Sequence, residues 1–176
     1  MTEDRGRLFE IAKTVIVVVL IAVLVRSFIV QTFYVSGASM EPSYHDGEYL
    51  LVDKLSYHFR APRRGEVIIL QFPKDERKDF IKRVIGLPGE RVEVRGGAVY
   101  IDGRALDEPY LSGANVTSGG DPVKLGEDEF YVLGDNRNNS SDSRSWGVLP
   151  RRDVLGRSWL RFWPPGKTGL AARPSY

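Results

Sequence analysis

Two segments of the 176-residue chain carry side chains that could perform nucleophilic hydrolysis. Ser39 follows two small residues, which would let an extended peptide backbone approach its hydroxyl. Lys82 lies in an apolar run, 80–85, and a strand there would place it on one face with Phe80 and Val84. Partial desolvation on that face would lower the lysine pKa from about 10.4 toward neutrality, as a general base requires. The plainer alternatives are an ordinary turn around Ser39 and a water-facing edge strand around Lys82.

A third segment, 134–147, packs polar residues more densely than a simple turn needs. It reads GDNRNNSSDSRSWG and follows the strand-like run 130–133. Aspartate and arginine side chains within it can pair with each other and brace a site. Taken alone, the segment is explained equally well as a solvated loop.

The amino-acid composition excludes several classes of activity. Because the chain has no cysteine, disulfides, thiolate catalysis and cysteine-ligated zinc are excluded. Its two histidines are His45 and His58, although most serine hydrolases use a histidine base. A net charge of +2 argues against a dedicated nucleic-acid-binding protein, which usually carries a concentrated basic face. A content of 42% apolar and 27% charged residues predicts a folded globular body.

The N-terminal part predicts a membrane anchor over residues 11–32, with residues 1–10 in the cytoplasm. Its apolar core, 15–25, is flanked by Lys13 and Arg26, which could extend toward opposite interfaces. More positive charge precedes the core than follows it, which predicts a cytoplasmic N-terminus and an extracytoplasmic body. The alternatives are a cleavable signal peptide and a buried soluble helix.

The body, residues 33–165, predicts a mostly β domain, a folded-over antiparallel sheet or barrel. The signals are short β-branched runs and a hairpin at Gly96-Gly97. The predicted strands are 49–53, 65–72, 80–85, 91–94, 98–101, 130–133 and 154–162. Residues 111–128 are expected to form a loop, and residues 166–176 a loose C-terminal tail.

An aromatic cluster, Trp159, Phe162 and Trp163, lies near the end of the last predicted strand. Core packing within the strand is its first explanation. A surface that rests on the bilayer interface is the alternative.

The segments around Ser39, Lys82 and residues 134–147 together resemble the bacterial type I signal peptidases, a family of serine-lysine proteases. Residues 36–42 match the S-G-x-S-M-x-P of the family's serine box, with Ser43 where threonine is usual. Residues 82–89 match the lysine box, K-R-V-x-G-x-P-G. Residues 134–147 match the third box, G-D-N-R-x-x-S-x-D-S-R-x-W-G, in full. The resemblance extends over about residues 26–164, most of the chain.

The resemblance implies a role for each matched residue. Ser39 would be the nucleophile that forms an acyl-enzyme, and Lys82 the general base. Ser140 would help to orient the lysine amine. The supporting ion pairs would be Asp142 with Arg144 and Asp135 with Arg83.

The resemblance also implies an oxyanion hole and a substrate-binding strand. The oxyanion hole would use the Ser39 N–H, and Gly37 stands where some members add a hydroxyl. The substrate would add as a strand between the segments before the serine and before the lysine. The residues expected to contact substrate are Phe33, Val35, Ser36, Met40, Asp79 and Ile81.

The implied function is removal of signal peptides from secretory preproteins at small-x-small (Ala-x-Ala) sites by an enzyme in the plasma membrane. The implied partners are these preproteins and the lipid bilayer, with no nucleic acid, cofactor or metal. Two alternatives stand beside it. One is a self-cleaving repressor-type protease, which would carry an N-terminal DNA-binding domain; the other is a catalytically silent, membrane-tethered β module that binds extended peptides.

Overall fold

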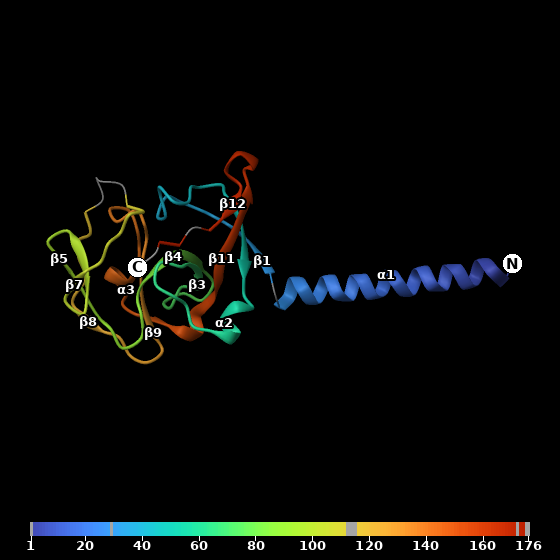
Figure 1. Ribbon diagram of the computed structural model, residues 1–176, viewed down its shortest axis with the longest axis horizontal. Coiled ribbons are helices and arrows are strands. Elements are labelled where there is room, and N and C mark those ends of the chain that lie inside the picture. Colours follow the sequence, from blue (N-terminus) through green and yellow to red (C-terminus); the bar gives the residue numbers. More distant parts are fainter. Residues whose placement is uncertain (1, 29, 112–115, 172, 175–176) are drawn as a thin grey trace.

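The computed structural model describes residues 2–28, 30–111, 116–171 and 173–174. A long N-terminal helix, α1 (Thr2–Phe28), projects away from a body made of two antiparallel sheets (Figure 1). Directly after α1 the chain enters the edge strand β1 (Val30–Tyr34), so the helix joins the body at one end of the larger sheet.

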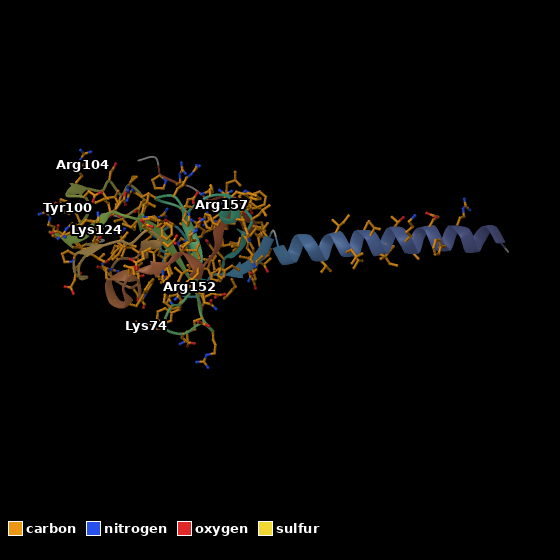
Figure 2. The ribbon with its side chains drawn as sticks, turned by 90° about the horizontal axis from the view of Figure 1, so that it is seen from below. Lys74, Tyr100, Arg104, Lys124, Arg152 and Arg157 are labelled. Atoms are coloured by element: carbon orange, nitrogen blue, oxygen red, sulfur yellow. The ribbon has the colours of Figure 1, made fainter. Side chains whose placement is uncertain are left out.

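The larger sheet has eight strands in the described part of the chain, in the order β1-β2-β11-β3-β4-β9-β10, with β12 paired to β11. The smaller sheet has four, in the order β7-β6-β5-β8. Its labelled residues Arg104 and Lys124 lie at the end of the molecule opposite α1 (Figure 2). The remaining strands are β2 (Tyr49–Asp53), β3 (Val67–Gln71), β4 (Asp79–Gly86), β5 (Arg91–Arg95), β6 (Ala98–Ile101), β7 (Arg104–Ala105), β8 (Val123–Lys124), β9 (Glu129–Leu133), β10 (Leu149–Pro150), β11 (Val154–Trp163) and β12 (Gly169–Leu170).

Short helices fill the connections between the strands. They are α2 (Ser56–Phe59), α3 (Ser143–Trp146) and the 3-10 turns η1 (Arg151–Asp153) and η2 (Pro165–Lys167).

The core explains the apolar runs at the centre of the larger sheet. Strand β3 is buried from Val67 to Leu70 and β4 from Ile81 to Gly86, because both faces of these strands are covered. Alternate residues enter different clusters: Val67 and Ile69 pack with Ile81, whereas Ile68 and Leu70 pack with Val84. Lys82 stands opposite Ile68 in the β3–β4 register and is therefore carried on a buried strand.

The mostly β antiparallel prediction is confirmed, and each predicted strand is present within a few residues of its expected bounds. Two predicted irregular segments are partly wrong. The expected loop 111–128 contains the short strand β8, and the expected loose tail contains β12, which pairs with β11 at Leu160. The aromatic cluster is also not core: Trp159 and Trp163 are 42% and 51% exposed.

The predicted membrane span over residues 11–32 is not found. None of the helices in the described part of the chain combines the length and apolar character needed to cross a membrane. The uninterrupted apolar run, 15–25, ends at charged Lys13 and Arg26, whereas roughly 20 apolar residues are needed for a span. The helix also ends at Phe28, and residues 30–34 belong to β1.

Candidate active site

Ser39 lies in the loop between β1 and β2, and the loop is held at its base by backbone hydrogen bonds. Val35 N–H donates to the Glu48 carbonyl at 2.8 Å, and Gly47 N–H donates to the Val35 carbonyl at 3.0 Å. The neighbouring Met40 side chain is 1% exposed and anchors the loop in the core. The nucleophile candidate is therefore placed on a well-fixed turn.

Lys82 reaches this turn from strand β4. Its Nζ lies 2.9 Å from Ser39 Oγ and 2.8 Å from the Ile81 carbonyl oxygen, and the residue is 3% exposed. Burial lowers the pKa of the Lys82 amine to about 8, while the carboxylates of Asp142 and Asp135 act in the opposite direction. About a tenth of the amine is therefore neutral at pH 7 and about half at pH 8, within hydrogen-bond reach of the serine hydroxyl.

A cleft of about 370 Å³ opens beside this pair. Four of the predicted substrate-contacting residues line it: Phe33, Ser36, Asp79 and Ile81. Its other lining residues are Gly37, Ala38, Ser39, Phe80, Lys82, Asn139 and Ser141.

The remaining two predicted substrate contacts are placed elsewhere. Val35 and Met40 are each 1% exposed and pack in the core, so neither lines the cleft. Among the lining residues, sequence reasoning missed Ala38, Phe80, Asn139 and Ser141. All four lie within or beside the matched boxes, and this adjacency is the only signal that could have found them.

The polar segment after β9 forms a buried scaffold behind the site. The Asp142 carboxylate accepts hydrogen bonds from Arg144 Nε and Nη2, both at 2.8 Å, and from Gly134 N–H at 3.1 Å. Asp135 pairs with Arg83, whose Nε lies 2.7 Å from Oδ1. Both carboxylates are fully buried, so each depends on its arginine for compensation.

Gly134 packs directly against the nucleophile turn. A Cβ at this position would overlap the Ser39 carbonyl oxygen and Ser140 Oγ, so only glycine fits. The buried Ser140 hydroxyl has no hydrogen-bond partner among the described residues. The contact predicted between Ser140 and the Lys82 amine is therefore not formed here.

Of the two backbone N–H groups at the predicted oxyanion site, that of Ser39 is free among the described residues and that of Gly37 is already hydrogen-bonded. No described residue accepts a hydrogen bond from the Ser39 N–H. Gly37, at φ +88°, donates its N–H to Asp46 Oδ1 at 2.7 Å. The Gly37 N–H is thus engaged in holding the turn.

The described residues contain no candidate metal centre. In that part of the chain, no three His, Cys, Asp or Glu side chains gather as ion ligands would.

A buried lysine with a lowered pKa, hydrogen-bonded to a serine at the edge of a cleft on a β scaffold, is the arrangement that a serine hydrolase using lysine in place of histidine requires. The chain belongs to the signal peptidase family, peptidase S26, whose model matches residues 8–163. The resemblance drawn from the three boxes is confirmed, and the chain is a serine peptidase by family.

Two sequence relatives support the assignment over nearly the full length of the chain. A probable signal peptidase I-2 of Synechocystis is 43% identical over 167 residues, covering 92% of this chain and 76% of that protein. A signal peptidase I of Leptolyngbya laminosa is 44% identical over 178 residues, covering 96% and 87%. A crystal structure of a signal peptidase I from Enterococcus faecalis is 32% identical, with a TM-score of 0.49, and covers 56% of this chain and 97% of that one.

Proposed function

We propose that this chain removes signal peptides from secretory preproteins, with Ser39 as nucleophile and Lys82 as general base. The observation that carries the proposal is the 2.9 Å separation between Lys82 Nζ and Ser39 Oγ on a buried strand. The names of the relatives, signal peptidase I, supply the substrate class.

The reaction follows from this geometry. The neutral Lys82 amine accepts the Ser39 proton as Oγ bonds to the scissile carbonyl carbon. The oxyanion that forms accepts a hydrogen bond from the Ser39 N–H. The Lys82 ammonium then protonates the leaving amine, which gives an acyl-enzyme. Water, deprotonated by Lys82, attacks the ester, and the Lys82 ammonium returns the proton to Ser39 Oγ as the ester C–O bond breaks.

The cleft supports binding of an extended peptide. Phe33 and Ile81 line it from the segments before Ser39 and before Lys82, and the exposed Asp79 lies at its edge. A strand added between these segments would place alternate side chains toward the cleft, which favours small residues at two positions. Asp135 with Arg83, and Asp142 with Arg144, hold the polar segment that backs the site.

Cleavage of a synthetic peptide tests the proposal. A peptide with an Ala-x-Ala site should be cut after the second alanine, and a matched peptide with leucine at both positions should resist. The Ser39→Ala variant should lose the activity. Equal turnover by Ser39→Ala and the wild-type protein would contradict the proposal.

The proposal includes attachment to the plasma membrane through α1. Apolar side chains on α1 from Phe9 to Val23 are 48–69% exposed, and nothing in the body covers them. The exposed residues Phe162 and Trp163 lie on β11, which belongs to the same sheet as β1, the strand that follows α1. Aromatic rings of this kind favour the bilayer interface.

Truncation tests the attachment. Removing residues 1–28 leaves β1 intact, so the shortened protein should move to the soluble fraction and still cleave a soluble peptide. If it stays membrane-bound, α1 is not the main attachment.

A further inference from the structure

Asn136 contacts the nucleophile turn at two points, although neither the proposed dyad nor its ion pairs include it. Its backbone N–H donates to the Ser39 carbonyl at 3.0 Å. Its side-chain Nδ2 donates to the Ala38 carbonyl at 3.1 Å. One residue therefore holds the two carbonyl groups that flank the nucleophile's backbone.

The Ala38 carbonyl accepts two hydrogen bonds, from Asn136 Nδ2 at 3.1 Å and from the Glu41 N–H within the turn at 3.2 Å. The bond from Asn136 ties this carbonyl, and with it the next N–H, to the polar segment behind the site. In a trans peptide the carbonyl oxygen and the following N–H lie on opposite sides of the chain. Because Asn136 holds the Ala38 carbonyl, the Ser39 N–H points to the side away from Asn136. The cleft is lined by Ala38 and Ser39 and not by Asn136. The Ser39 N–H has no acceptor among the described residues and is free for a ligand in the cleft.

Asn136 is itself held firmly by its neighbours in the chain. On one side, Asp135 is buried in its ion pair with Arg83. On the other, Arg137 donates to the Gly134 carbonyl at 3.0 Å and to Glu108 Oε2 at 2.9 Å. A residue fixed on both sides can transmit a defined position to the turn it contacts.

We propose that Asn136 is a positioning residue that orients the Ala38–Ser39 peptide group so that the Ser39 N–H meets the developing oxyanion. This inference rests on the proposed function. As Ser39 Oγ bonds to the carbonyl carbon, the π electron pair moves to the carbonyl oxygen, and the correctly aimed N–H donates to it. The contribution of Asn136 is therefore greatest in the transition state.

The test compares Asn136→Asp with the wild-type full chain in mild detergent, using the Ala-x-Ala peptide. Aspartate keeps the size and the backbone N–H but replaces the Nδ2 donor with an oxygen that the Ala38 carbonyl repels. We expect kcat to fall about 10²-fold, with KM within about threefold, since a misdirected oxyanion donor costs about as much as a lost one. In Asn136→Ala, which adds no charge, the pH at which activity reaches half its maximum should stay unchanged, because no hydrogen bond joins Asn136 to Lys82.

Two variants complete the experiment. Asn138→Asp makes the same change at an exposed position in the same loop and should keep kcat within about twofold. Asn136→Ala removes the amide without adding charge, and it decides the question if the aspartate variant does not fold.

The outcomes separate the two proposals. The positioning role is wrong, while the dyad stands, if the folded Asn136 variants keep a kcat within threefold of wild type or lose rate only together with an equal rise in KM. A pH profile shifted in Asn136→Ala would contradict the positioning role in the same way. If the wild-type protein does not cleave the peptide, the proposed function fails, and the inference fails with it.

Discussion

Arg83 and Asp135 form a buried ion pair with two hydrogen bonds, in which Nε lies 2.7 Å from Oδ1. The pair joins β4, next to Lys82, to the polar segment behind the site. Arg83 also donates to the Gly65 carbonyl at 2.8 Å, so its guanidinium is extensively bonded.

Asp135→Asn should lower the free energy of unfolding by about 3–5 kcal/mol, because it leaves the Arg83 charge buried without a counter-charge. Urea unfolding at pH 7 in mild detergent measures the change. Asp75→Asn is the matched control: its partners Arg77 and Lys78 are exposed, and no measurable change is expected. An Asp135→Asn variant as stable as wild type would show that the pair is dispensable.

Activity should depend on pH through Lys82. Its pKa is lowered to about 8, and only the neutral amine can accept the Ser39 proton. The value of kcat/KM should therefore rise about tenfold per pH unit below pH 8 and level off above it. A rate that is flat between pH 6 and pH 8 would exclude neutral Lys82 as the base.

Burial of Lys82 should also lower the free energy of unfolding at neutral pH. The amine pKa is lower in the folded chain, about 8, than the ordinary value of 10.5. The folded state is therefore penalised below pH 8, and the penalty is relieved as the pH rises from 8 to 10.5. Lys82→Met should be more stable than wild type by about 3 kcal/mol at pH 7, with the advantage shrinking toward pH 10.5. Urea titrations at both pH values measure it; a variant less stable at pH 7 would contradict the prediction.

Gly134→Ala should abolish most activity because its methyl group would displace the Ser39 carbonyl or Ser140. A displacement of about 1 Å at the nucleophile costs about 10²-fold in rate. Gly126→Ala is the control, since its methyl group would meet only the flexible Glu129 side chain. Peptide cleavage rates for the two variants measure the difference; similar rates would show that the site tolerates a side chain at residue 134.

The sequence predicted the central strands because their signals are local. Strand β2 has the predicted bounds, 49–53, and the Gly96-Gly97 turn joins β5 to β6 as expected. Strand β12 has no such local signal. It consists of two residues, which form a strand because they pair with β11 at Leu160. The exposure of Trp159 and Trp163 likewise depends on which face the sheet leaves uncovered, and composition alone favours the core.

Site residues could be predicted from the sequence where they belong to a matched box. Contacts between segments that are distant in the chain could not. Ser39 and Lys82 stood out by their boxes, and the structure places them together. Val35 and Met40 lie beside the serine but point into the core, and this depends on the direction of the turn. The Asn136 contact with Ala38 joins residues 98 positions apart, so no local pattern could reveal it.

The most direct test of the central claim is a double-mutant cycle on Ser39 and Lys82, measured as kcat/KM for the Ala-x-Ala peptide. If the two residues act as one unit, Ser39→Ala and Lys82→Met should each lose at least about 10³-fold, and the double variant should lose no more than either single variant. A Lys82→Met variant that keeps a tenth of wild-type activity, or losses that multiply in the double variant, would contradict a serine-lysine dyad.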